Sequence, residues 1–138
     1  MKKLLASIPL LFCIFLCSAQ TDTVKRINKS ATDQDKTYAK VERESAFPGG
    51  ERAWRNFLQE NLEYPAKAKR KNIQGIVVVQ FIVNTDGTIS DISAISGPEE
   101  LQQAAIKVIK KSPNWIPAFQ YDKNVRSYKK QPVGFALQ

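Results

Sequence analysis

The sequence predicts an α+β domain in which a β-hairpin is packed against helices. The first observation is a run of β-branched and aromatic residues at 75–83 that a turn joins to a second run at 89–96. The second is a pair of amphipathic patterns with helical spacing, at 51–62 and 99–111. The third is a final strand-like run at 125–136. A hairpin alone is only marginally stable, so the other elements must cover it.

The hairpin is built on a central strand whose two faces are both largely apolar, which predicts a strand covered on both sides. One face carries Val77, Val79, Phe81 and Val83, and the other carries Ile76, Val78, Gln80 and Ile82. Asp86-Gly87 supplies the turn. In the returning strand, isoleucines recur every three residues, which predicts a β-bulge near Asp91.

Helices are predicted on both sides of the hairpin in the sequence. The first ends at Tyr64-Pro65, where Pro65 opens a second, short and basic helix. The third follows Gly97-Pro98, with acidic residues in its first turn and lysines in its last turn, which complements the helix dipole. Their apolar stripes are Trp54, Phe57, Leu58 and Leu62 in the first helix and Leu101, Ala104, Ala105, Val108 and Ile109 in the third.

The segment after the third helix holds large apolar residues in a loop between prolines. We expect Trp115 and Phe119 to fill the end of the core. A turn is expected at residues 122–124. Pro132 cannot donate to a strand ladder, so the final strand is predicted to lie at a sheet edge or to carry a bulge. Val133, Phe135 and Leu137 are expected to face the core.

Residues 1–19 have the layout of a secretory signal peptide. Lys2-Lys3 precedes an apolar run at 4–16, and Ser18-Ala19 offers a cleavage site. The alternative is a short, uncleaved membrane anchor. Residues 20–45 are polar and mixed in charge, which predicts a disordered tether, so that the globular domain spans 46–138.

Composition leaves little material for catalysis. The chain has no histidine, and both of its cysteines, Cys13 and Cys17, lie in the leader. The exported chain therefore lacks the commonest general base and thiol chemistry, and we expect no enzyme activity, cofactor or metal site. The net charge of +8 favours acidic partners, but export makes nucleic acid an unsuitable one.

The chain resembles the TonB carboxyl-terminal domain family over residues 46–138. Seven motifs stand in that family's order and spacing: Phe47-Pro48-Gly49-Gly50, Tyr64-Pro65, Ile73-Gln74-Gly75, Val79-Gln80-Phe81, Asp86-Gly87, Pro113-Asn114-Trp115-Ile116-Pro117-Ala118 and Pro132-Val133-Gly134-Phe135. The Phe-Pro-Gly-Gly opening resembles the Bacteroidetes branch of these energy transducers.

This resemblance implies a three-stranded antiparallel sheet with helices on one face, and a function in the periplasm. Family members bind the TonB box of TonB-dependent outer-membrane transporters, which adds as a strand to the edge of the last strand. The implied contact residues are Asn61, Tyr64 and Pro65, together with Arg126, Ser127, Tyr128, Lys129 and Lys130. Asn61 stands where the family usually has glutamine, and Tyr64-Pro65 has an equal alternative as a structural corner.

The chain also departs from a full TonB transducer. A transducer has an uncleaved anchor with a histidine and a long proline-rich spacer, whereas this chain has a leader that looks cleavable and a short tether. The alternative function is therefore a stand-alone periplasmic interaction module without energy transduction, which uses the same edge for a homodimer or another envelope protein. A retained leader would add inner-membrane proton-channel partners.

Overall fold

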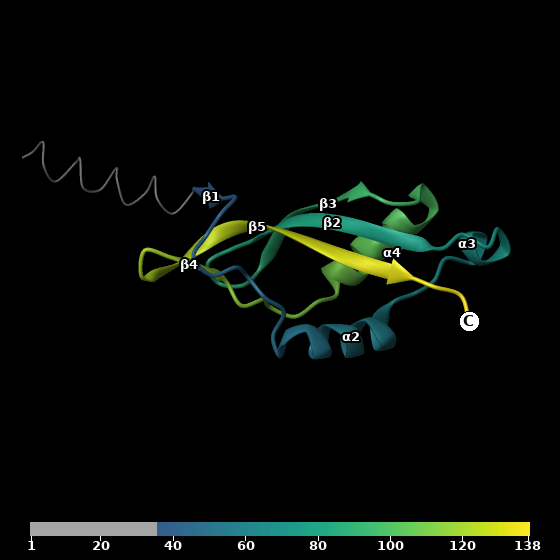
Figure 1. Ribbon diagram of the computed structural model, residues 1–138, viewed down its shortest axis with the longest axis horizontal. Helices are drawn as coiled ribbons and strands as arrows, with labels where there is room; N and C mark the ends of the chain where they lie inside the picture. The colour runs from purple at the N-terminus through teal and green to yellow at the C-terminus, as the bar shows by residue number, and fades with distance from the viewer. Residues whose placement is uncertain (1–35) are drawn as a thin grey trace, which may run out of the picture. The chain divides into compact units, whose positions relative to one another are not determined.

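The computed structural model describes residues 36–138, so the predicted leader, its two cysteines and the first part of the predicted tether lie outside the described residues. The described part has an α+β fold, as predicted (Figure 1). Its elements, in chain order, are β1 (Thr37–Tyr38), α2 (Gly50–Asn61), α3 (Ala66–Arg70), β2 (Gly75–Val83), β3 (Ile89–Ser96), α4 (Glu99–Lys110), β4 (Ala118–Gln120) and β5 (Lys123–Phe135).

Strand β2 is the central strand of the sheet. It pairs antiparallel with β3 on one side and with β5 on the other, in the order β1-β5-β2-β3. The predicted three-stranded antiparallel sheet is thus confirmed as β3, β2 and β5. Two short strands extend it, because β1 pairs parallel with β5 and β4 pairs antiparallel with the beginning of β5.

The hairpin contains the predicted bulge. Gln80 pairs with Ser93 and Ile82 pairs with Ser90, so one residue of β2 faces two residues of β3 at Asp91. Asp91 has a positive φ of 50°, which is the left-handed conformation that aspartate tolerates better than most residues. The prediction of a bulge at this position is confirmed.

The turn of the hairpin is held by Asp86. Its carboxylate accepts hydrogen bonds from the hydroxyl and the backbone N–H of Thr88, at 2.6 and 3.0 Å. These two bonds, the hydroxyl's first, hold the pKa of the Asp86 carboxyl below its ordinary value. Asp86 therefore serves the turn, as the Asp86-Gly87 pattern predicts.

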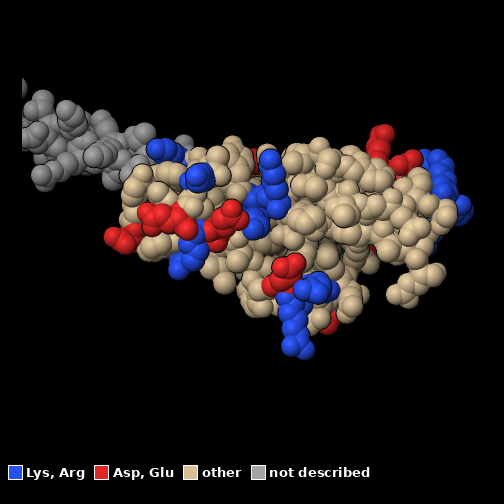
Figure 2. All heavy atoms as spheres, in the orientation of Figure 1, with Lys and Arg blue, Asp and Glu red and all other residues tan. Residues whose placement is uncertain are grey.

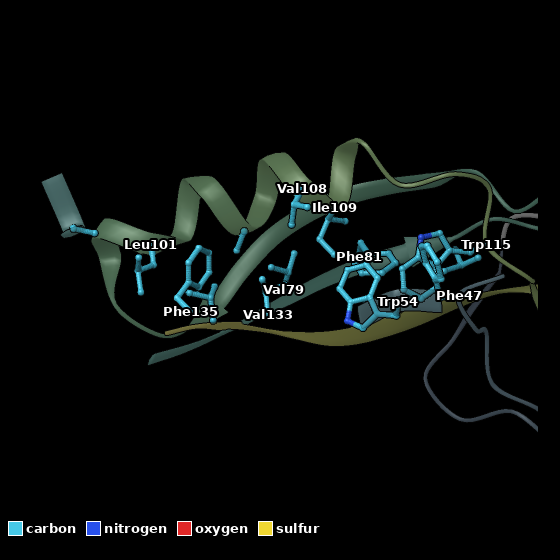
Figure 3. Packing of buried hydrophobic residues seen from close by; sticks show 14 residues of the cluster. Phe47, Trp54, Val79, Phe81, Leu101, Val108, Ile109, Trp115, Val133 and Phe135 are labelled. Carbon is cyan, nitrogen blue, oxygen red and sulfur yellow. The ribbon is translucent and has the colours of Figure 1, made fainter. Parts of the chain in front are cut away.

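The core lies on one face of the sheet, between the strands and α4 (Figure 3). It takes the odd-numbered side chains of β2, the end of β5 and the apolar stripe of α4, and α2 adds Trp54. The largest members are Phe47, Trp54, Phe81, Leu101, Ile109, Trp115 and Phe135. The amphipathic stripes predicted for both long helices face this cluster, which confirms their helical spacing.

Trp115 occupies the end of this core, as predicted. Only 3% of the residue is exposed, and its ring meets Phe47 and Phe81 edge to face, with centroids 5.4 and 5.1 Å apart. The indole N–H donates to Ser112 Oγ at 2.9 Å. The N–H of the buried indole ring therefore has a hydrogen-bond acceptor.

Glu63, between α2 and α3, connects this region to α4 by ion pairs. Lys107 and Lys111 bind its carboxylate at 2.8 and 3.1 Å. The hydrogen bond from Lys107, followed by that from Lys111, lowers the pKa of the Glu63 carboxyl below its ordinary value. The lysines at the end of α4 thus have a specific partner in addition to the helix dipole.

Several predictions for individual residues were wrong. Phe119 is half-buried in β4 and outside the core cluster, with the Arg43 guanidinium 4.8 Å from its ring centroid. The turn occupies Tyr121 and Asp122, which both have positive φ, and β5 already begins at Lys123. Ile76 is 61% exposed, because the helices cover only one face of the sheet.

The ordered domain also begins earlier than the predicted boundary at residue 46. Besides β1, residues 43 and 46 pair with the segment that leads into β5: Arg43 exchanges two backbone hydrogen bonds with Phe119, and Ala46 exchanges two with Ile116. Composition predicted residues 36–45 in the tether, but their backbone groups bond to the domain. Composition describes only side chains, so it could not predict this pairing of backbone groups.

Candidate functional site at the edge of strand β5

The two edges of β5 have different partners. Along one edge, residues 127–135 pair with residues 75–83 of β2 in a register without interruption. On the opposite edge, β1 pairs with Arg126 and Ser127. From Tyr128 to Phe135, no described residue pairs with that opposite edge. This stretch is called the open edge below, and unpaired edge groups of this kind are a template for another strand.

Pro132 determines which backbone groups the open edge presents. It lies opposite Val78 in the uninterrupted register with β2. Proline has no N–H, and within sheets its nitrogen faces away from the ladder. Since the direction of the N–H alternates along a strand, the N–H groups of Tyr128, Lys130 and Gly134 face outward, while those of the odd-numbered residues face β2.

The open edge includes three of the predicted contact residues. Tyr128 is 47% exposed, Lys130 is exposed and Lys129 is half-buried. Arg126 and Ser127, predicted for the same surface, instead pair with β1. The Arg126 Nε donates to Asn84 at 3.1 Å, and the Ser127 hydroxyl is buried without a hydrogen-bond partner among residues 36–138.

The other predicted contacts lie in a structural corner. Asn61 donates to the Phe57 carbonyl at 2.9 Å, within its own helix end. The Tyr64 hydroxyl donates to the Ile73 carbonyl, and its ring meets Phe135 edge to face at 5.6 Å. Pro65 precedes α3 as its N-cap. The geometry thus gives Tyr64 a structural role, and a partner contact for these residues stays a prediction.

A groove of about 580 Å³ lies where β1 ends and the open edge begins. One wall is the segment 39–44, and the other is formed by β5 with Gln80 of β2. The lining residues are Ala39, Val41, Glu44, Gln80, Ser127, Tyr128, Lys129 and Lys130. Sequence reasoning missed the wall at 39–44, which has no local signal, whereas Gln80 could have been noticed as the polar residue in an apolar strand.

The groove is mixed in charge. Lys129 Nζ lies 3.6 Å from the Glu44 carboxylate, whose side chain is 81% exposed. In Figure 2, lysine and arginine atoms stand beside acidic ones over the region where Figure 1 places β1 and β5. Among residues 36–138, no group of acidic side chains could hold a metal ion, and no helix combines the length and apolar character needed to cross a membrane.

Comparison with known proteins finds sequence similarity to TonB proteins. The family model described as the Gram-negative bacterial TonB protein C-terminal matches residues 60–137. Protein tonB2 of Pseudomonas aeruginosa is 36% identical over 77 residues, which are 54% of this chain. The match spans only 28% of that relative's length.

Among solved structures, the solution structure of the Helicobacter pylori TonB-CTD is similar to this chain. It matches with a TM-score of 0.49 and 26% sequence identity, over 61% of this chain and 77% of the other. The family match begins after Phe47-Pro48-Gly49-Gly50. The Bacteroidetes branch therefore stays a prediction.

Proposed function

Because this chain belongs to the family of Gram-negative bacterial TonB C-terminal domains, we propose that it is a periplasmic domain that binds the TonB box of an outer-membrane TonB-dependent transporter. Binding occurs by β-strand addition and supports energy-coupled transport. The proposed function is peptide binding and not catalysis, so it requires no cofactor.

The observation that carries the proposal is the open edge of β5. Outward N–H groups at Lys130 and Gly134, beyond the residues that pair with β1, and the outward carbonyls near them match the groups that an extended peptide presents. Main-chain hydrogen bonds supply affinity in this mode of recognition, while neighbouring side chains select the sequence. The edge is also protected from unwanted pairing by Pro132 and by lysines.

The proposal extends to energy coupling only with a membrane link. The match spans 28% of the length of Protein tonB2, so the comparison covers only a part of that relative. A retained leader would provide the link to inner-membrane proton-channel partners. A cleaved leader would leave a periplasmic adaptor that binds the TonB box without transmitting force.

The test is the binding of synthetic TonB-box peptides to the exported chain, followed by NMR shifts of backbone N–H groups. We expect the largest shifts along residues 128–134. Lys130→Pro removes an outward donor and leaves the bonds to β2 in place, so it should fold but lose most of its affinity. Lys130→Ala keeps the N–H and is the matched control, with a loss of about two- to threefold, the size of a rim charge effect.

The position of the proline matters. At Ser127 or Lys129 a proline would remove a bond to β2, and it would test folding instead of binding. If Lys130→Pro stays folded and binds like the wild type, or if the shifts lie away from β5, strand addition at this edge is wrong. A concentration-dependent dimer with shifts along the same edge would then favour the stand-alone interaction module.

A further inference from the structure

The groove at the head of the open edge places two adjacent lysines on opposite faces of the sheet. Lys129 lies opposite Phe81, whose side chain is in the core, so Lys129 projects on the face that carries the helices. Lys130 lies opposite Gln80 and projects on the other face. A peptide strand added at this edge alternates its side chains in the same way, so each of its residues meets only one of the two lysines.

Lys129 is the better-defined of the two cations. Its side chain is 21% exposed, which limits both screening by solvent and the number of conformations that it can adopt. The contact with Glu44 is long, at 3.6 Å, and Glu44 itself is largely exposed. The Glu44 carboxylate thus lies beside the Lys129 ammonium group but is only loosely held by it.

We propose that this groove is a subsite for a carboxylate side chain of the bound peptide, and that Glu44 is its internal occupant in the free protein. The inference rests on the proposed function, because the peptide must already lie along the open edge. An aspartate or glutamate on the helix-bearing face of the added strand replaces Glu44 at Lys129 Nζ. An acidic residue one position away falls on the other face and does not reach this cation.

The composition of the groove supports a carboxylate as the ligand. The one acid that lines the groove, Glu44, contacts the cation Lys129, whereas Lys130 projects on the other face. Ser127 also lines the groove, and its buried hydroxyl has no hydrogen-bond partner among the described residues. A buried hydroxyl without a partner is costly, and a carboxylate is a strong acceptor for it.

The experiment compares peptides that differ only by Asp or Asn, placed in turn at each position along the TonB box. For the wild type we expect the Asp peptide to bind about two- to fivefold more tightly at low salt, only at the peptide position that lies beside Lys129 on the helix-bearing face, which is the effect of a partly exposed ion pair. Lys129→Gln should abolish this preference. Glu44→Gln should increase it, because the internal competitor is gone.

Two further variants serve as comparisons. Lys130→Gln removes the same charge one residue away and should keep the Asp preference at the peptide position beside Lys129. Lys110→Gln, at the exposed end of α4, should leave both peptides unaffected. The preference should also fall as salt is raised.

Failure of this subsite is distinguishable from failure of the proposed function. Equal binding of the Asp and Asn peptides at all positions, with shifts still along residues 128–134, would overturn the subsite alone. So would a preference that survives Lys129→Gln. If no peptide perturbs the edge, the proposed function itself is wrong.

Discussion

The strongest test of the fold is the truncation of Trp115 to alanine. The side chain is almost fully buried and makes edge-to-face contacts with Phe47 and Phe81. Truncation of a large buried aromatic residue costs about 3–5 kcal/mol. Domains are typically stable by only about 5–15 kcal/mol, so this variant should lose about a fifth or more of its free energy of unfolding.

The cost is expected to come from packing and not from an orphaned polar group. The partner of the indole N–H, Ser112 Oγ, also donates to the Ile109 carbonyl and keeps that bond in the variant. The Trp115 backbone N–H still reaches the Gly87 carbonyl. Loss of packing therefore dominates.

The assay is urea unfolding followed by far-UV circular dichroism. Ile116→Ala is the matched control, since its side chain is adjacent in sequence but 47% exposed, and it should cost less than about 1 kcal/mol. A Trp115→Ala midpoint close to the wild type would refute the placement of this ring at the end of the core.

Three other predictions follow from single sites. Gly87→Ala should cost about 1–3 kcal/mol from the positive φ alone, and more because its Cβ would lie 2.3 Å from the Trp115 carbonyl oxygen, whereas Gly134→Ala meets open space and serves as the control in thermal unfolding. The pKa of the Glu63 carboxyl is lowered in the folded state, so its ion pairs stabilise the fold above the pKa of the unfolded chain. This stabilisation is lost as the pH falls through the pKa of the folded state. The difference in free energy of unfolding between wild type and Glu63→Gln should therefore be larger at pH 7 than at pH 3, and an equal difference would contradict this. Mass spectrometry of the native envelope protein should show a chain that starts at Gln20, and an intact leader would revive the membrane anchor.

Local patterns were sufficient to predict most of the fold. Helices α2 and α4 follow from stripes of apolar residues with helical spacing, and the hairpin follows from Asp86-Gly87 between two strand-like runs. The bulge at Asp91 was predictable because a period-two strand cannot place Ile89, Ile92 and later residues on the core face without one extra residue. In each of these cases the determining interactions lie within a few residues of each other.

These local patterns could not predict the backbone pairing between segments far apart in the sequence. Residues 37–46 bond to β4, β5 and the segment before them through backbone groups, which any polar sequence can offer. Phe119 was expected in the core because it is large and apolar, yet β4 directs it to the segment at Arg43 instead. The role of Tyr64 was undecidable from sequence, since its hydrogen-bond acceptor, the Ile73 carbonyl, is a backbone atom without a residue signature.

At the candidate site, the structural consequence of Pro132 can be worked out only from the strand register. Pro132 indicated an edge strand or a bulge from the sequence alone, and only the register shows to which side the N–H groups of Ser127 and Lys129 point. The uninterrupted register with β2 excludes a bulge there, so both residues direct their N–H groups to β2. In the proposed strand addition, Lys130 would offer its backbone N–H to the peptide, while Lys129 would offer only its side chain. If a peptide adds at this edge as proposed, a proline at Lys130 should remove most of the affinity, whereas loss of the Lys129 charge should change only which peptides are preferred.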